Sequence, residues 1–392
     1  MNEETFRKRQ QVLQTYLKRE QLLGMVTSRE ALMYLTGLRM EGHERLIALL
    51  MSGHHALWVV PRLEEETVSL TGLSAVTYTD DEAIQDVLTR ALLRLVGESG
   101  DASTDHLAKS LPFTGVAVEK KQIPLFFAES LDASLSRLFS SLPRVNWIDL
   151  DETLARQRMV KDANEQAYLK EAARRLSNVL DTVMAEDLKP GMREIDLVHA
   201  IEARARKMGV REMSFPTIVL SGARASLPHG ESSEAPIEAG FLLIDLGFAV
   251  SGYHADMTRT YILGEPDARA LDMLKVVLEA QEKAIRCIRP GVSYSELDQV
   301  ARESLRAYGY DAYFTHRLGH GLGLSVHERP SIHALETLPI ASGHAFTVEP
   351  GIYLPGVGGV RIEDDVLIED DGSVRILTTS SKRLEDLIRS WP

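Results

Sequence analysis

The chain has 392 residues, of which 44% are hydrophobic and 26% charged, so it is long enough for two globular domains with separate cores. Its formal net charge of −13 argues against a nucleic-acid-binding surface, because phosphate contacts require clustered Lys and Arg. The single cysteine, Cys287, excludes an intrachain disulfide. The sequence shows neither a signal peptide nor the ~18 apolar residues of a membrane span. We therefore expect a cytoplasmic protein that binds neither nucleic acid nor membrane.

Residues 1–150 alternate between helical and strand-like segments, which predicts an α/β domain with a mixed sheet. An amphipathic helix is expected over residues 4–23, ended by Gly24. Further helices are expected over residues 81–97 and 123–140, and strands over residues 46–51, 55–61, 75–79, 115–118 and 145–150. The first two of these strands are joined by a short turn and predict a hairpin.

The pattern of the sequence changes near residue 151. A long helical pattern over residues 151–188 ends in a Lys-Pro-Gly turn, and a strand is expected over residues 214–222. The other predicted helices cover residues 194–209, 266–289 and 294–308, and strands and glycine-rich turns make up the remainder. The predicted elements follow the order helix pair, strands, helix pair, strands. This order suggests a domain over residues 151–392 that is built of two similar halves.

Residues 241–261, which read FLLIDLGFAVSGYHADMTRTY, predict a β-hairpin that carries two aspartates. If the reversal is centred between Val250 and Ser251, Asp245 and Asp256 oppose one another directly, with Cβ atoms roughly 5 Å apart on one face. Two carboxylates this close in an apolar strand persist only if one is protonated or a cation lies between them. The alternative is a surface hairpin with two solvated acids.

A second hairpin with the same geometry is predicted over residues 346–368. A reversal centred on Gly356 places Glu349 opposite Glu363, so that two more carboxylates share one face of apolar strands. Arg361 lies two residues before Glu363, shares its face and can neutralise a neighbouring acid.

The acidic residues that follow are expected to lie outside this cluster. Asp364 should point to the opposite face of the strand from Glu363. Asp365 is expected to belong, with Glu369, Asp370 and Asp371, to an exposed and solvated run.

The segment HRLGHGLGLSVHE (316–328) holds three histidines between glycines that let backbone or ligand approach closely. It lacks the lysine of a Walker loop and the spacing of a dinucleotide fingerprint. Four inward carboxylates and one imidazole carry a negative charge that two divalent cations balance. This oxygen-rich set of ligands favours Mn²⁺, Co²⁺, Fe²⁺, Zn²⁺ or Mg²⁺. Two such ions ~3.5 Å apart can activate a water and polarise a carbonyl, which is hydrolytic chemistry.

With these motifs the chain resembles the Xaa-Pro peptidases of the pita-bread metallopeptidase group, aminopeptidase P and prolidase. The resemblance covers nearly the whole chain and rests on the Asp pair and on MYLTG (33–37), RMVKDANEQ (158–166), HRLGHGLGLSVHE (316–328), EPGIY (349–353) and GVRIED (359–364). It implies an α/β (α+β) fold, with a pita-bread catalytic domain over residues 151–392. A smaller creatinase/prolidase-like α/β domain over residues 1–150 would precede it.

The resemblance also implies a ligand set, residue by residue. Asp245 is similar to a ligand of one metal ion, and His320 is similar to the sole imidazole ligand. Asp256 and Glu363 look like the two carboxylates that bridge both ions. Glu349 looks like a ligand that also serves as general base.

Four further residues take their expected roles from the same resemblance. His229 is similar to the histidine that handles the proton of the leaving proline, and His327 to the one that contacts the substrate carbonyl. His316 looks like a residue that lines the proline pocket, and Arg361 like an arginine that braces the metal carboxylates. A structural role inside the core is the alternative for each histidine.

The implied function is that of a dinuclear metal exopeptidase that cleaves between an N-terminal residue and proline. Two divalent ions per chain are expected, with manganese first and cobalt or zinc as alternatives. Substrates would be Xaa-Pro dipeptides or longer peptides with proline in second position, and the family implies a homodimer. The sequence does not separate a dipeptidase from an aminopeptidase.

Three other functions are open to a chain of this kind. The first is a creatinase-like amidinohydrolase on the same fold, which uses histidines and no metal, and the second is a non-catalytic binding module. Retention of all five ligand positions argues against both. The third is methionine aminopeptidase chemistry, which the N-terminal domain of about 150 residues disfavours.

Overall fold

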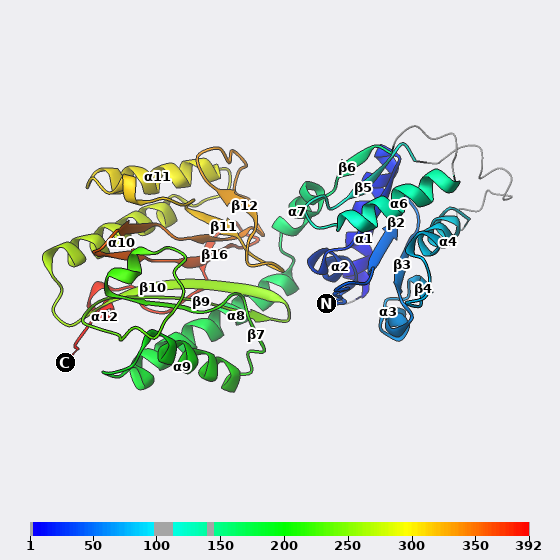
Figure 1. Ribbon diagram of the computed structural model, residues 1–392. Coiled ribbons are helices and arrows are strands. Elements are labelled where there is room, and N and C mark those ends of the chain that lie inside the picture. The colour runs from blue at the N-terminus through cyan, green and yellow to red at the C-terminus, as the bar shows by residue number, and fades with distance from the viewer. Residues whose placement is uncertain (1–2, 98–112, 139–144, 392) are drawn as a thin grey trace. The chain divides into compact units, whose positions relative to one another are not determined.

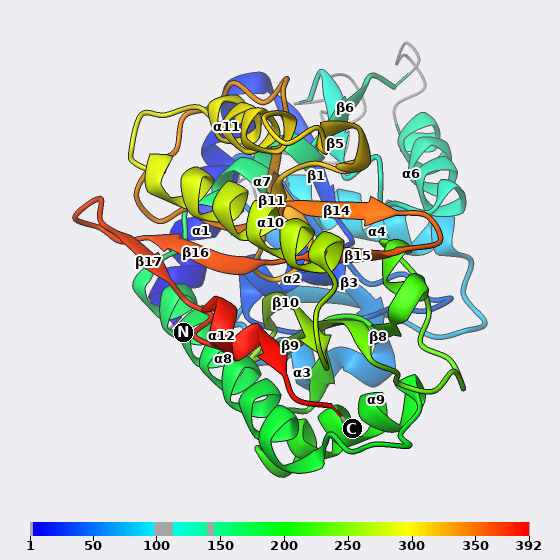
Figure 2. The same ribbon diagram turned by 90° about the vertical axis from the view of Figure 1, so that its left-hand side faces the viewer.

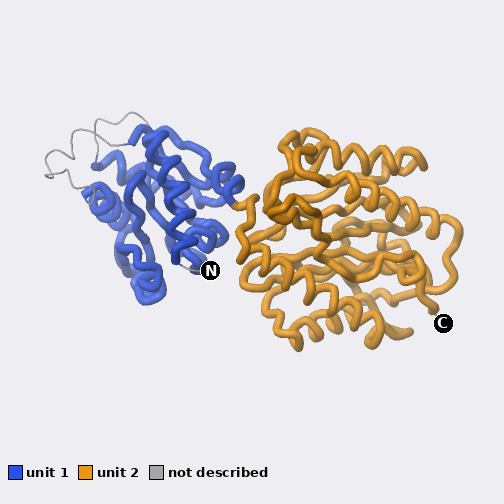
Figure 3. The backbone as a smooth tube through the Cα atoms, turned by 180° about the vertical axis from the view of Figure 1, so that it is seen from behind, with its two compact units in different colours: residues 1–157 blue, residues 158–392 orange. Residues whose placement is uncertain are grey.

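The computed structural model describes residues 3–97, 113–138 and 145–391. It divides into two compact units, Met1–Gln157 and Arg158–Pro392 (Figure 3). The boundary between them falls inside helix α7 (Asp151–Met159). Within the described residues, no helix is both long enough and apolar enough to cross a membrane.

The first unit is built on a six-stranded mixed sheet in the order β4-β3-β2-β1-β5-β6, which confirms the predicted mixed sheet. Its strands are β1 (Leu22–Val26), β2 (Ala48–Met51), β3 (Ala56–Pro61), β4 (Ser74–Tyr78), β5 (Gly115–Val118) and β6 (Trp147–Asp149). Its helices besides α7 are α1 (Glu3–Glu20), α2 (Arg29–Thr36), α3 (Glu65–Ser69), α4 (Ile84–Gly97) and α6 (Leu125–Leu138). The predicted β2–β3 hairpin is antiparallel as expected. Leu23, Leu50 and Val59 are fully buried in one cluster with the apolar faces of α4 and α6.

The prediction that Gly24 ends the first helix is wrong, because α1 stops at Glu20 and Gly24 lies inside β1. A Cβ at Gly24 would lie 2.8 Å from the Leu17 side chain. This glycine therefore lets α1 pack closely against the strand that follows it, a use of glycine that resembles a stop signal in the sequence.

The second unit contains two five-stranded sheets and a two-stranded ribbon. One sheet has the order β18-β10-β9-β7, with β8 also paired to β9; the other has the order β12-β11-β13-β16-β17; and β14 pairs with β15. The strands are β7 (Glu212–Met213), β8 (Ile218–Ser221), β9 (Gly240–Val250), β10 (Tyr253–Leu263), β11 (Gly319–Gly321), β12 (Glu328–Ile332), β13 (Ala345–Val348), β14 (Gly351–Leu354), β15 (Gly358–Arg361), β16 (Asp364–Ile368), β17 (Val374–Ile376) and β18 (Ile388–Arg389).

Two helix pairs enclose these strands. The helices are α8 (Ala163–Thr182), α9 (Glu194–Lys207), α10 (Ala268–Cys287) and α11 (Tyr294–Arg306), and a short α12 (Leu384–Leu387) precedes β18. Figures 1 and 2 show α8 and α9 on one side of the strands and α10 and α11 on the other. This layered arrangement of two helix pairs around strands agrees with the two similar halves predicted from the sequence.

The long helix predicted from residue 151 is interrupted. It consists of α7 and α8, because Asp162 caps α8 by accepting from the backbone of Asn164 and Glu165 while Glu165 bonds back to the Asp162 backbone. This capping box begins a new helix inside a sequence whose helical periodicity continues on both sides.

The β9–β10 hairpin is present, but its predicted register is wrong by two residues. Asp256 stands opposite Gly247, and Asp245 stands opposite Thr258. The turn consists of Ser251 and Gly252, both with positive φ (52° and 81°), which is the conformation that matches the twist of a two-residue hairpin. A shift of two residues keeps every side chain on its face, so both aspartates still point the same way.

The register predicted for the second hairpin is confirmed. Gly351 pairs with Arg361 in the ribbon, and Val348 pairs with Asp364 where the same hairpin continues as β13 and β16. Glu349 and Glu363 lie at the break between the two ladders. Their backbone amides donate instead outside the hairpin, Glu349 to Leu318 O just before β11 at 2.8 Å and Glu363 to Thr258 O of β10 at 3.1 Å.

Candidate functional site

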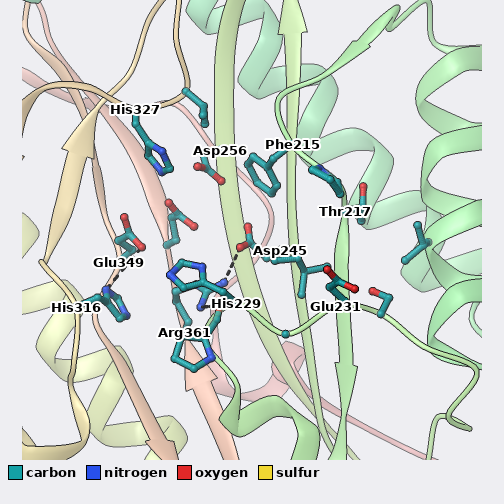
Figure 4. Close-up of a pocket in the computed structure, with 18 of the residues that line it drawn as sticks. Phe215, Thr217, His229, Glu231, Asp245, Asp256, His316, His327, Glu349 and Arg361 are labelled. Carbon is teal, nitrogen blue, oxygen red and sulfur yellow. Dashed lines mark hydrogen bonds and ion pairs between the residues drawn. The ribbon is translucent and has the colours of Figure 1, made fainter. Parts of the chain in front are cut away.

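A cavity of about 670 Å³ lies inside the second unit and is lined by all nine residues that the sequence analysis singled out (Figure 4). They are Asp245, Asp256, His320, Glu349, Glu363, Arg361, His229, His316 and His327. These residues come from β9, β10, β11, β15, the break between β13 and β14, the break between β15 and β16, and three loops. Segments more than a hundred positions apart in the chain thus contribute to one site.

A carboxylate and imidazole cluster occupies the middle of the cavity. Ligand atoms of Asp256, His320 and Glu363 all lie within 4.8 Å of one another, and all three residues are buried. His320 Nε2 is 3.3 Å from Glu349 Oε1 and 3.8 Å from Asp256 Oδ2. Asp245 lies on the same face of the β9–β10 hairpin as Asp256. The five expected ligands therefore converge.

Two carboxylate oxygens in this cluster are buried without a hydrogen-bond partner among the described residues, Asp245 Oδ1 and Asp256 Oδ1. An unpartnered buried carboxylate oxygen is costly, and a bound cation removes that cost. Burial and repulsion from Glu363 raise the pKa of Asp256 well above its ordinary value, and burial and repulsion from Glu349 do the same for Glu363. The donor set fits divalent cations with a preference for oxygen ligands.

His320 is oriented as a metal ligand would be. Its Nδ1 lies 3.1 Å from the Gly321 carbonyl oxygen, so Nδ1 carries the proton and the lone pair of Nε2 faces Asp256 and Glu349. Burial, with a contribution from neighbouring His327, lowers the pKa of His320 well below its ordinary value. The ring is therefore neutral, as coordination requires, and its backbone contact fixes the tautomer.

Glu349 differs from the other acids in the cluster. Burial raises its pKa to about 7, partly opposed by the cation Arg361, and Thr347 Oγ1 donates to its Oε1 at 3.0 Å. A carboxyl with a pKa near neutrality can accept and release a proton at physiological pH.

Arg361 connects the carboxylate and imidazole cluster to the surrounding wall. Its Nη2 lies 2.5 Å from Asp245 Oδ2, its Nε donates to Thr258 Oγ1 at 2.9 Å, and its Nη1 donates to the Tyr353 hydroxyl at 2.8 Å. Thr258 in turn donates to Glu363 Oε2 at 2.7 Å. Arg361 therefore neutralises an acid, as predicted, although that acid is Asp245.

The sequence analysis missed Thr258 and Tyr353. Thr258 lies two residues after Asp256 and hence on the same strand face, so strand periodicity could have identified it. Tyr353 carries no comparable signal, because its role depends on contact with Arg361 and His316 across the ribbon.

His316 forms a neutral wall of the cavity. Its Nδ1 lies 2.8 Å from the Arg317 carbonyl oxygen and its Nε2 lies 2.9 Å from the Tyr353 hydroxyl, so Nδ1 donates and Nε2 accepts. Burial and the charge of Arg361 lower the pKa of His316 to about 3. The ring therefore stays uncharged at neutral pH.

The other two histidines lie nearer to open space. His327 packs edge-to-face on His320, with ring centroids 4.3 Å apart, and burial lowers its pKa. His229 is exposed, and it follows Pro228 on the loop after β8. Both histidines line the cavity without joining the carboxylate cluster.

The prediction of an exposed Asp365 is wrong. Asp365 is fully buried and accepts from the Asp256 backbone amide at 3.0 Å, which holds β10 against β16 beside the carboxylate and imidazole cluster. Asp364 is also fully buried, and it forms ion pairs with Arg259 and Lys382 away from the cavity. Neither of these long-range contacts can be read from the acidic run itself.

Comparison with known proteins follows the same division of the chain. Metallopeptidase family M24 matches residues 167–370, and the creatinase/prolidase N-terminal domain matches residues 9–160. The fold and the cluster of carboxylates and imidazole define a metal-dependent peptidase. The chain belongs to metallopeptidase family M24, which confirms the resemblance seen in the sequence and argues against a fold-sharing binding module.

Individual relatives support this assignment over nearly the full chain. An uncharacterized peptidase from Staphylococcus epidermidis is 35% identical over 355 residues, 90% of this chain and 93% of the relative. A dipeptidase from Pyrococcus horikoshii is 32% identical with a TM-score of 0.84, covering 99% of this chain and 100% of that one. An Xaa-Pro dipeptidase from Bacillus anthracis is 27% identical with a TM-score of 0.84, covering 98% and 100%.

Proposed function

We propose that this protein is a dinuclear metal-dependent exopeptidase that hydrolyses the bond between an N-terminal residue and proline. The observation that carries the proposal is the pair of orphaned buried oxygens on Asp245 and Asp256, set in a cavity large enough for a small peptide. The similarity to an Xaa-Pro dipeptidase supports proline as the residue after the scissile bond.

Asp245, Asp256, His320, Glu349 and Glu363 would hold the two ions. When bound, divalent ions lower the pKa of a water and polarise the substrate carbonyl. Manganese is the proposed native ion, with cobalt or zinc as alternatives, because four of the five donors are carboxylates.

Individual residues of the chain then have separate roles in peptide hydrolysis. Glu349, with its pKa of about 7, accepts a proton from the attacking water. His327 lines the cavity beside His320 and donates to the oxyanion that forms at the carbonyl.

The leaving group sets a further requirement. The nitrogen of an Xaa-Pro bond carries no hydrogen, so it must receive a proton as the bond breaks. His229, at the exposed edge of the cavity, is the proposed donor. Neutral His316 offers an uncharged wall for the proline ring.

Arg317 favours dipeptides over longer peptides. Two guanidinium groups line the cavity, and Arg361 is already paired with Asp245. Arg317 donates to Ser331 Oγ at 3.1 Å and has no carboxylate within ion-pair distance among the described residues. A free substrate carboxylate on proline would supply that partner through a charge-assisted hydrogen bond. We therefore propose Xaa-Pro dipeptidase as the subtype and Xaa-Pro aminopeptidase as the alternative.

The proposed function is tested by assaying Ala-Pro, Ala-Pro-amide and Ala-Pro-Ala side by side with Mn²⁺, Co²⁺ and Zn²⁺. We expect Ala-Pro to be hydrolysed fastest. Arg317→Met should reduce hydrolysis of Ala-Pro about tenfold or more and leave Ala-Pro-amide nearly unchanged. Efficient hydrolysis of Ala-Pro-Ala by the wild type would instead assign an aminopeptidase, and full activity of metal-free protein would refute the metal mechanism.

Three further proposals rest on the sequence or on the family alone. The two compact units would be a creatinase/prolidase-like N-terminal domain and a pita-bread catalytic domain. The protein would be a homodimer and would reside in the cytoplasm, where a single free cysteine such as Cys287 stays reduced. Analytical ultracentrifugation of the full chain tests the oligomeric state.

A further inference from the structure

The cavity extends to both sides of the metal cluster. Figure 4 shows His316 and Glu349 on one side of Asp245, and Thr217 and Glu231 on the other. If proline occupies the side of His316, as the proposed function has it, the residue before the scissile bond must occupy the opposite side. That second side combines apolar walls with two carboxylates and one hydroxyl.

The walls of the second side are apolar. Ile195 and Val198 of α9, Phe215 and Ile218 line the cavity, and Ile218 stands directly across from Asp245 in the β8–β9 ladder. Such walls suit a side chain with an extended hydrocarbon stem.

Two carboxylates and one hydroxyl are added to these walls. Glu202 and Glu231 line the cavity, and neither side chain has a hydrogen-bond or ion-pair partner among the residues that the structure describes. Thr217 is only 5% exposed, and its Oγ1 is buried without a partner. Glu231 is exposed and Glu202 half-buried, so the buried Thr217 hydroxyl is the group that indicates a missing hydrogen-bonding partner. The two acids that line the same cavity favour a cationic partner.

Helix α9 carries one of these acids and anchors the loop that carries the other. Glu202 lies on the helix itself, and buried Glu194 at its start accepts from the backbone and hydroxyl of Ser233, at 2.9 and 2.8 Å. Ser232 Oγ also accepts from the Val219 amide at 2.7 Å, which joins the Glu231 loop to β8. Nearby Arg224 forms an ion pair with Glu194 and donates from Nη2 to the backbone carbonyl of Glu231, and it makes no ion pair with the Glu231 carboxylate.

We infer that the enzyme prefers lysine or arginine as the residue before proline. The hydrocarbon stem would lie along the apolar walls, and the cationic head would be bound by Glu202, Glu231 and the Thr217 hydroxyl. Lys and Arg combine these two properties in one side chain. This inference rests on the proposed Xaa-Pro activity and adds the identity of Xaa to it.

The experiment compares Lys-Pro with norleucyl-proline, which has the same stem, α-amino group and carboxylate but lacks the side-chain ammonium. We expect kcat/KM for Lys-Pro to exceed that for norleucyl-proline about fivefold, the size expected of partly solvated ion pairs. The ratio should fall as ionic strength rises from roughly 0.05 to 0.5 M, because salt screens partly exposed charges.

Variants then locate the preference. The double variant Glu202→Gln/Glu231→Gln should bring the ratio to about one while it leaves norleucyl-proline hydrolysis unchanged, which also shows that the variant is folded. Thr217→Val should lower the ratio by a smaller factor. Glu238→Gln is the matched control, because Glu238 is an exposed acid in the same region that does not line the cavity.

Each other outcome overturns the inference in a distinguishable way. A ratio of one or less in the wild type, with norleucyl-proline hydrolysed, refutes the basic preference and leaves the peptidase function intact. Equal losses on both dipeptides in the double variant would assign the carboxylates to the α-amino group instead. Hydrolysis of neither dipeptide with any of the three metals would overturn the proposed function, and the inference with it.

Discussion

Arg361 Nη2 lies 2.5 Å from Asp245 Oδ2, inside a pair of side chains that are both almost completely buried. The same guanidinium also donates to the hydroxyls of Thr258 and Tyr353. Because Thr258 donates onward to Glu363, one cation orients two of the expected metal ligands. We therefore propose Arg361 as a positioning residue for those ligands.

Arg361→Met should destabilise the metal-free protein by about 3–5 kcal/mol, since it leaves the buried carboxylate of Asp245 without its cation. The free energy of unfolding is measured with urea. Arg375→Met is the control, because Arg375 forms an ion pair with Glu369 at the exposed β16–β17 edge and should change stability far less. Equal losses in both variants would show that Arg361 does not brace the site.

Asp256→Ala and Glu363→Ala should each reduce the metal content from two ions per chain to less than one, because both residues are proposed to bridge the two ions. His320→Ala should weaken mainly one ion. Elemental analysis after dialysis against a defined Mn²⁺ concentration measures this directly. Retention of two ions in Asp256→Ala or Glu363→Ala would rule out the bridging assignment.

The variant His229→Ala should retain its metal content and have a lower kcat. General acid–base assistance is typically worth about 10²–10⁴-fold in rate, and His229 lies outside the carboxylate cluster. The loss in kcat should shrink for substrates whose leaving group is already a weak base. His199→Ala, a change at an exposed position of α9 outside the cavity, should leave kcat unchanged. Wild-type turnover or loss of metal in His229→Ala would contradict the assignment.

In the metal-free protein, the titration of Glu349 should contribute a loss of stability as pH rises from about 4.5 to about 7. Burial raises the pKa of Glu349 from 4.5 to about 7 in the folded chain, so the unfolded chain releases this proton first. Between the two values the native state binds more protons, and the free energy of unfolding therefore falls with pH. Added Mn²⁺ should remove the loss, because it binds the ionised carboxylates of the native state.

Urea unfolding of wild type and Glu349→Gln across this range isolates the effect. The comparison is needed because burial lowers the pKa of His344 to about 4 and that of His316 to about 3, and these groups make stability rise with pH below about pH 6.5. Parallel pH profiles for the two proteins would mean that Glu349 does not titrate as stated.

Strand periodicity was sufficient to predict that the candidate ligands lie together, and the reason is geometric. Side chains in a strand repeat every two residues, so an error of two in the β9–β10 register left Asp245 and Asp256 on one face. The error in register arose at the turn, because Ser251 adopts a positive φ, which is uncommon for serine and so was not expected from the sequence. The second register was correct because its turn is centred on Gly356, which has a φ of 75°.

Contacts between distant strands could not be predicted from local pattern. Asp365 looks like part of a solvated acidic run, yet it is buried because β10 packs across β16 and offers the Asp256 amide. Arg259, for which the sequence pattern gave no prediction, is fully buried against Asp364 and Ser380 O. Both outcomes depend on how two hairpins meet, and neither hairpin contains that information alone.

The breaks at Glu349 and Glu363, where the chain passes from one sheet into the β14–β15 ribbon, have a consequence for biosynthesis. The proposed ligands are spread from Asp245 to Glu363, and the backbone amide of the last of them donates to Thr258 O of β10. A nascent chain on the ribosome therefore has no complete ion-binding pocket until nearly the whole polypeptide has emerged. If these residues hold metal ions as proposed, metal capture would be a late event coupled to completion of the second unit, and partly synthesised chains would be kept from acquiring hydrolytic activity.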